Sequence, residues 1–168
     1  MRAGGARMDR PIRRPEEILA YRSLQRILGA KPPALWSVAP TDTVRAALQI
    51  MADKDIGLVV VLEQGRLAGV VSERDCARRA LLAGKSLDTA AVSEIMVRDV
   101  VTVEMSYAFA DCLRLMHQHR IRHLVVTDKG SPVAVVSIRD MLNEAVNHHA
   151  KIIAELERER LTMFTSTV

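Results

Sequence analysis

The order of hydrophobic and polar positions along this chain predicts a set of short elements that recurs. In the first half, a helix with one buried face is indicated by apolar residues at the i, i+3, i+4 and i+7 spacing, namely Val44, Ala47, Leu48 and Met51. Two β-branched runs follow, at 57–62 and 67–71, with a turn between them, which is typical of adjacent strands. A short strand at 36–38 precedes this helix and another helix begins at Ser72, so the first half has the pattern β-α-β-β-α.

The second half of the chain repeats this pattern at a constant spacing of 65 residues. Residues 41–75 align with 106–140 without a gap, and a V-V-S-x-R-D motif ends both copies. The positions of the first copy with an identical counterpart are Leu48, Met51, Ile56, Val60, Val61, Gly65, Val70, Val71, Ser72, Arg74 and Asp75. An internal repeat is the first guide to the architecture of a fold. We therefore predict an α/β (α+β) fold in which two pseudo-symmetric repeats pack sheet to sheet, because either copy alone buries little core.

Helices are also predicted at both ends of the chain. One begins at Pro15 and ends at Leu28, ahead of a glycine and two prolines. The last is predicted from Met141 to about Leu161, where apolar residues recur among charges, and it is a candidate for contact with another subunit. The predicted organisation is a basic flexible arm at 1–18, a first repeat with its leading helix at 19–95, a second repeat at 96–147, and a C-terminal helix and tail at 148–168.

Composition and charge narrow the classes of function. Of the 168 residues 49% are hydrophobic but only 3% are aromatic, so the chain is poorly supplied with the stacking platforms that bind single-stranded nucleic acid. The formal net charge is +4, and the surplus is concentrated in the N-terminal arm at Arg2, Arg7, Arg10, Arg13 and Arg14. A solvated tail is the favoured interpretation of this arm, with contact to nucleic acid or a membrane surface as the alternative.

Several other classes of protein are not favoured. The longest purely aliphatic run, Leu58 to Leu62, is too short to span a bilayer, and the N-terminus lacks the apolar segment of a secretory signal, so we predict a cytoplasmic protein. Cys76 and Cys112 have no metal or redox spacing, and Cys112 falls on a predicted core stripe. His117 and His119 point to different faces of a helix, so no metal site is predicted. Without a glycine-rich phosphate loop or a nucleophile beside a base, the sequence does not predict an enzyme.

The two copies resemble a known family. Repeats that end in GVVSERD and AVVSIRD, with IGLVVV in the first and HRIRHLVV in the second, are similar to a tandem pair of cystathionine-β-synthase (CBS) domains, called a Bateman module. The similarity covers roughly residues 20–147, and no part of the chain resembles an attached enzyme. It implies a stand-alone regulatory module that binds adenosine-containing ligands (AMP, ATP or NAD) between the repeats and forms a homodimer through its helices.

The resemblance also implies which residues hold the nucleotide. Asp75 and Asp140 of the Ser-x-x-Asp motifs would bind ribose hydroxyls, with Ser72 and Ser137 near the phosphate. The chemistry agrees, because a carboxylate matches adjacent 2′- and 3′-hydroxyls and a helix N-terminus favours an anion. Arginines available for charge-assisted bonds to phosphate are Arg74, Arg139 and Arg78. By resemblance the apolar slot for adenine is lined by Ser37, Val38, Ile56, Gly57, Leu58, Thr102, Val103, Ile121, Arg122, His123 and Leu124, of which Arg122 and His123 face either a phosphate or solvent.

Other interpretations stay open. Ser-x-x-Asp before a helix is also an ordinary N-terminal cap, so each motif taken alone fits a purely structural role. A nucleotide-independent scaffold that binds a target protein through its helices is therefore one alternative. A sensor of S-adenosylmethionine is another, although serine and arginine at the phosphate position favour AMP, ATP or NAD.

Overall fold

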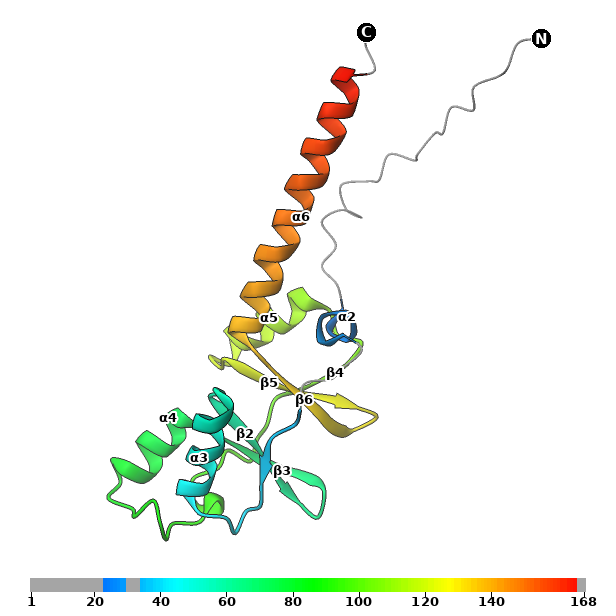
Figure 1. Cartoon of the computed structure of the whole chain (residues 1–168). Coiled ribbons are helices and arrows are strands. Elements are labelled where there is room, and N and C mark those ends of the chain that lie inside the picture. The colour runs from blue at the N-terminus through cyan, green and yellow to red at the C-terminus, as the bar shows by residue number, and fades with distance from the viewer. Residues whose placement is uncertain (1–22, 30–33, 166–168) are drawn as a thin grey trace, which may run out of the picture. The chain divides into compact units, whose positions relative to one another are not determined.

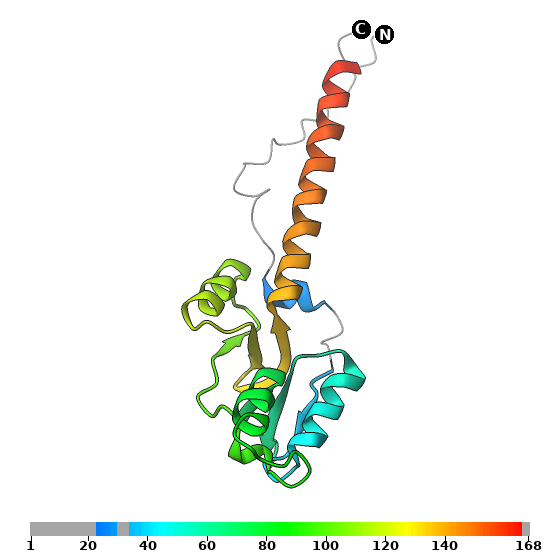
Figure 2. The same cartoon turned by 90° about the vertical axis from the view of Figure 1, so that its left-hand side faces the viewer.

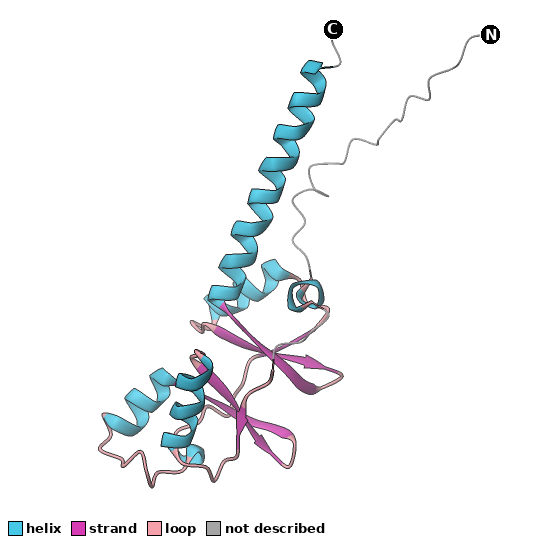
Figure 3. Cartoon of the chain, viewed as in Figure 1, coloured by secondary structure: helices cyan, strands magenta, loops and turns pink. Residues whose placement is uncertain are grey.

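The computed structural model describes residues 23–29 and 34–165, in two compact units that divide between Glu144 and Ala145. The first unit contains the strands and most of the helices (Figure 1, Figure 3). Its strands are β1 (Ser37–Val38), β2 (Leu58–Glu63), β3 (Arg66–Ser72), β4 (Thr102–Glu104), β5 (His123–Asp128) and β6 (Ser131–Ser137). Its helices are α2 (Leu24–Leu28), α3 (Val44–Lys54), α4 (Glu73–Asp75), the π-helix η1 (Cys76–Leu81), the 3₁₀ turn η2 (Val92–Glu94) and α5 (Phe109–Gln118), and α6 (Ile138–Thr165) continues into the second unit.

Each copy forms a three-stranded sheet with the same topology. In the first sheet β1 pairs parallel with β2, and β2 pairs antiparallel with β3; in the second, β4, β5 and β6 do the same. The registers correspond, since Leu58 lies opposite Ser72 and His123 lies opposite Ser137. Both hairpins turn through two residues with positive φ, and glycine supplies the second of them. The predicted duplication of β-α-β-β-α units is confirmed, and β3 and β6 contact each other across the two sheets.

The predicted helix stripes form the core of each copy. In α3, Val44, Ala47 and Met51 are buried, and Figure 2 shows this helix on one face of the first sheet beside η1. In α5 the corresponding buried residues are Phe109, Cys112 and Met116. Apart from Phe109 the buried core is aliphatic and sulfur-containing, as the scarcity of aromatic residues requires. Cys112 is completely buried, which confirms its assignment as a core residue.

The segment that leads into each copy is hydrogen-bonded to the other copy. Ahead of the first copy, Leu24 N–H donates to Tyr107 O at 3.2 Å and Gln25 N–H donates to Met105 O at 3.0 Å. Ahead of the second copy, the N–H groups of η2 make the equivalent bonds: Val92 donates to Asp42 O at 2.8 Å and Ser93 donates to Pro40 O at 2.9 Å. The acceptors in the two copies are related by the 65-residue shift. Each copy thus accepts hydrogen bonds from the segment that leads into the other copy, and the two copies form one unit.

After η2 the chain runs along the outer edge of β3. Val97 and Val70 exchange both backbone hydrogen bonds, at 2.9 and 3.0 Å. This close approach explains the glycine beside Val70, because a methyl group built on Gly69 would lie 2.7 Å from the carbonyl oxygen of Val97. The equivalent position of the second copy is Ala134, which is completely buried.

The ends of the chain differ in part from the prediction. Of the helix expected from Pro15 to Leu28, only the part after residue 22 lies within the described residues, and there Leu24–Leu28 is helical. The arm at 1–18 lies outside them. The last helix begins at Ile138, earlier than Met141, because Ser137 caps it directly. In the second unit Val146, Ile153 and Leu156 of this helix are more than half exposed.

Candidate functional site

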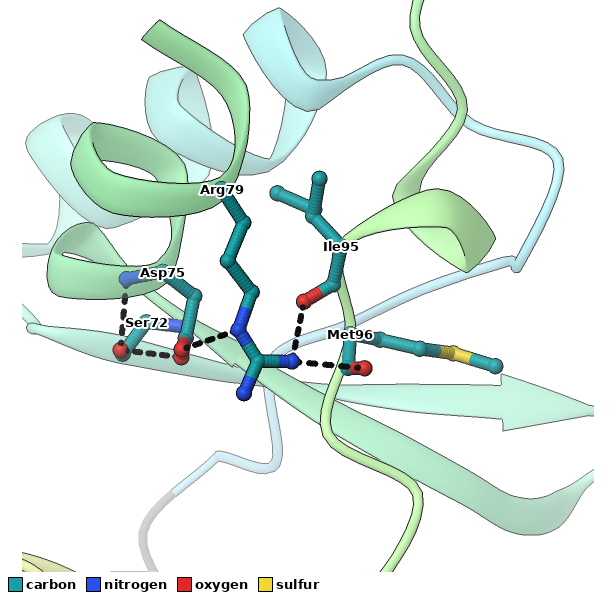
Figure 4. Close-up of polar contacts among 5 residues, drawn as sticks. All are labelled: Ser72, Asp75, Arg79, Ile95 and Met96. Atoms are coloured by element: carbon teal, nitrogen blue, oxygen red, sulfur yellow. Dashed lines mark hydrogen bonds and ion pairs between the residues drawn. The ribbon is translucent and has the colours of Figure 1, made fainter. Parts of the chain in front are cut away.

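The two Ser-x-x-Asp motifs stand where the third strand of each sheet passes into a helix. Ser72 keeps an extended backbone, and its hydroxyl accepts from Asp75 N–H at 3.2 Å while Asp75 Oδ2 accepts from Ser72 N–H at 3.1 Å (Figure 4). The second copy repeats this reciprocal cap, with Ser137 N–H 2.7 Å from Asp140 Oδ2. The structural role expected of these motifs is therefore present, and it uses Oδ2 of each aspartate.

The other oxygen of each aspartate has different surroundings in the two copies. Oδ1 of Asp75 is 3.6 Å from Nε of Arg79, and this arginine also donates to the carbonyl oxygens of Ile95 and Met96 at 3.2 and 3.4 Å (Figure 4). The residue equivalent to Arg79 in the second copy is Glu144, so this contact has no counterpart there. Asp140 is exposed, and its Oδ1 has no hydrogen-bond partner among the described residues. Sequence reasoning missed Arg79, one turn beyond the motif.

Both motifs open onto one cleft of about 890 Å³ between the copies. Twelve of the predicted site residues line it: Ile56, Gly57, Leu58, Ser72, Arg74, Asp75, Ile121, Arg122, His123, Ser137, Arg139 and Asp140. The cleft also has residues that the sequence reasoning did not select, among them Trp36, Asp55, Glu73, Asp99, Val101 and Arg120. Both aspartates therefore lie beside a cavity and are not sealed within their helix caps.

Six predicted site residues do not line the cleft. Val38, Val103 and Leu124 are buried, because their side chains point into the cores rather than toward the seam. Ser37, Thr102 and Arg78 also lie outside the lining. The residue before each first strand, Trp36 or Val101, occupies the lining position instead. The repeat alignment pairs these two residues and was the signal available to find them.

The cleft carries charges of both signs. Arg74, Arg120, Arg122 and Arg139 line it, and none of them forms an ion pair with another residue that the structure describes. The acidic residues of the lining are Asp55, Glu73, Asp75, Asp99 and Asp140. Unpaired guanidinium groups beside carboxylates suit a ligand that has both an anionic group and hydroxyl donors.

His123 lies at the seam between the copies. Its ring faces the backbone of the other copy, since a methyl group built on Gly57 would be 3.6 Å from His123 Cε1. Burial lowers the pKa of this imidazole, as do the neighbouring charges of Arg122 and Arg74, whereas Asp140 acts in the opposite direction. The ring is therefore neutral at neutral pH. In this state one ring nitrogen carries a proton, and the other can only accept a hydrogen bond.

The free energy of unfolding is expected to fall on acidification because of His123. Its pKa is lowered in the folded state, so the unfolded chain binds more protons; the stability contribution is complete above the ordinary pKa of about 6.5 and is lost as the pH falls through the folded value. His123→Leu, which copies the residue at position 58, should flatten this part of a pH series of urea unfolding curves. Exposed His117→Gln is the control, and an unchanged slope in His123→Leu would contradict the assignment.

The other reactive groups that the structure describes do not form a second site. Burial raises the pKa of both cysteine thiols to about 11, so neither is a thiolate at neutral pH. No group of three or more metal-binding side chains gathers within residues 23–29 and 34–165. Within the same ranges, no helix combines the length and the apolar character needed to cross a membrane.

Known proteins are similar to this chain in sequence and in fold. The family model for the CBS domain matches residues 30–81 and 92–147. The CBS domain-containing protein YhcV of Bacillus subtilis is 33% identical to this chain, and the match covers 68% of this chain and 81% of the length of YhcV. A putative signal-transduction protein with CBS domains from Burkholderia ambifaria superposes with a TM-score of 0.72 at 36% identity, covering 75% of this chain and 95% of that one. A CBS domain protein from Pyrobaculum aerophilum, solved in complex with AMP, superposes with a TM-score of 0.64 at 31% identity, covering 71% and 89%.

Proposed function

The chain belongs to the CBS-domain family as a tandem pair, and from this premise we propose that the regulatory module binds an adenosine-containing nucleotide, AMP, ATP or NAD, in the cleft between its copies. One observation carries the proposal. Both Ser-x-x-Asp motifs border a single cleft that also contains four arginines without ion-pair partners among the described residues.

The chemistry of the cleft fits the two polar parts of a nucleotide. Each aspartate has one oxygen occupied by its cap and a second, Oδ1, for the ribose hydroxyls. The helix N-termini behind Ser72 and Ser137, with Arg74 and Arg139 next to them, suit the phosphate. The Pyrobaculum aerophilum relative, which was crystallised with AMP, supports the same class of ligand for this chain.

The two halves of the cleft are proposed to differ in strength. Asp140 presents an oxygen without a partner among the described residues, whereas Oδ1 of Asp75 has Arg79 beside it. A ligand at the first motif has to compete with that arginine. The second motif, with Arg122 and His123 at its side, is therefore proposed as the tighter site.

A panel of ligands tests the proposal directly. AMP, ATP and NAD are expected to raise the midpoint of thermal unfolding, because a ligand that binds only the folded state stabilises it by mass action. S-adenosylmethionine and GMP belong in the same panel, the first as the alternative ligand and the second as a control for the base. If only S-adenosylmethionine stabilised the protein, the ligand would be S-adenosylmethionine and not AMP, ATP or NAD. No stabilisation by any adenosine ligand at about 1 mM would favour the scaffold.

The scaffold stays the second candidate because of one observation: both motifs already have a complete structural role as helix caps. In either case we propose that the module acts on a target protein and assembles as a homodimer. Nucleotide binding would regulate the target only by favouring one arrangement of the copies or subunits over another.

Removing the exposed part of α6 tests the homodimer. A chain that ends at Asn147 lacks Ile153 and Leu156, whose exposed apolar surface is proposed to bury itself against a second subunit. Light scattering after size exclusion should then show one truncated chain per particle, whereas the full chain should show two. The paired substitution Ile153→Ser with Leu156→Ser should act in the same way, and Lys151→Ser is the matched control. A full-length chain that is already monomeric, or a truncated one that stays dimeric, would contradict this role.

A further inference from the structure

The only tryptophan of the chain stands at the cleft rather than in a core. Trp36 lies immediately before β1, and its carbonyl oxygen accepts from Val60 N–H at 3.1 Å, which fixes its backbone to the sheet. Its side chain lines the cleft and is 38% exposed. A large apolar ring is usually among the most buried side chains of a domain, so this exposure on a concave surface calls for an occupant.

The ring is held by the last turn of α3. Nζ of Lys54 lies 4.3 Å from the centre of the indole and makes a cation–π contact that covers one face. Met51 and Ala52 at the same end of the helix, and Ile56 just beyond it, also line the cleft. Trp36 is therefore a wall of the cleft beside its apolar part, held from one side by Lys54 and partly exposed to a ligand.

The second copy has no such wall. The equivalent position is Val101, and among the described residues that line the cleft only Trp36 and His123 carry aromatic rings. The duplication preserved the serine, arginine and aspartate of both motifs but not this residue. The difference places a flat aromatic surface at one end of an otherwise aliphatic and charged cleft.

We propose that Trp36 is the stacking platform for the base of the bound nucleotide and that it determines a preference for purines over pyrimidines. This inference rests on the proposed nucleotide binding. A flat π-surface binds the faces of bases, and the two fused rings of a purine cover more of an indole than the single ring of a pyrimidine does. The aliphatic residues around it supply apolar contact but cannot make this distinction by stacking.

Titration of the full chain with AMP and with UMP tests the inference. Because Trp36 is the only tryptophan, AMP should change the tryptophan fluorescence of the wild-type protein directly. By calorimetry, Trp36→Leu should weaken AMP binding by about 5- to 150-fold, the usual range for loss of one aromatic–base stack. UMP binding should weaken less, so the ratio of AMP to UMP affinity should fall. Trp36→Phe should lie between the wild type and Trp36→Leu.

Tyr107→Leu is the matched control, because this ring is 37% exposed and does not line the cleft. It should leave the affinity for both nucleotides unchanged, and urea unfolding should show that all the variants are folded. If AMP binds the wild type but Trp36→Leu keeps its affinity, or loses AMP and UMP binding equally, the inference is wrong while the proposed function stands. If the wild type binds none of AMP, ATP and NAD, both fail.

Discussion

Alanine at both Asp75 and Asp140 is expected to weaken AMP binding strongly in both halves of the cleft. Each substitution removes a carboxylate that is placed to accept hydrogen bonds from the ribose hydroxyls, and the expected loss is about 1–3 kcal/mol for each. Asp140→Ala should have the larger effect, since Asp75 shares its Oδ1 with Arg79. Isothermal titration of the two single variants and the double variant measures both the size and the order of these losses.

These aspartates also cap helices, so a matched pair of variants has to separate the two roles. Loss of a cap costs about 0.5–2 kcal/mol of stability, and urea unfolding will show this for the alanine variants. Asparagine keeps an oxygen for the serine N–H but replaces the second oxygen by an amide donor. Asp75→Asn with Asp140→Asn should therefore remain folded and still bind poorly. Asp53→Ala, at an exposed acid outside the cleft, is the control. Wild-type affinity in the double asparagine variant would show that the carboxylates do not hold the ribose.

Gly69→Ala is expected to destabilise the fold strongly. Its methyl group would lie 2.7 Å from the backbone oxygen of Val97, which is closer than real methyl groups come to such an atom. Relief requires separating the segment after η2 from β3, which also strains the two hydrogen bonds between Val70 and Val97. Overpacking of this kind costs about 1–3 kcal/mol, which urea unfolding resolves.

Gly57→Ala is the control for this steric argument. Its methyl group would meet Glu73 Oε2 at 3.5 Å and His123 Cε1 at 3.6 Å, which are ordinary contacts, so its cost should be small. Equal stability of Gly69→Ala and the wild type would mean that the edge of β3 is looser than the hydrogen bonds indicate.

Most of the fold was predictable because its hydrophobic periods are strong and occur twice. The stripes of α3 and α5, both hairpins and both capped helices are local patterns, and the repeat made each one a test of the other. The reciprocal exchange of leading segments was not predictable. Nothing in the composition of α2 or η2 indicates which of the two copies each segment will bond to.

The candidate site was predictable only in its polar part. Ser72, Asp75 and their counterparts lie where a strand ends and a helix begins, and the Ser-x-x-Asp motif marks this boundary in the sequence. The apolar lining depends on which face of a two- or three-residue strand looks toward the seam. A shift by one residue exchanges the faces of a strand, and so Trp36 lines the cleft where Ser37 and Val38 were expected. Arg79 was missed because its contacts with Ile95 and Met96 join segments that are distant in sequence.

The exchange of leading segments makes each copy depend on the other. A polypeptide with a single copy would lack the strip of backbone that its turn at Pro40–Asp42 or Met105–Tyr107 requires, and only a second molecule would supply it. A chain that carries both copies supplies both strips itself, so its two halves are free to differ elsewhere. In the repeat alignment Gly57 and Leu58 correspond to Arg122 and His123, and Trp36 corresponds to Val101, so one cleft built from two copies of the same unit has two unlike ends.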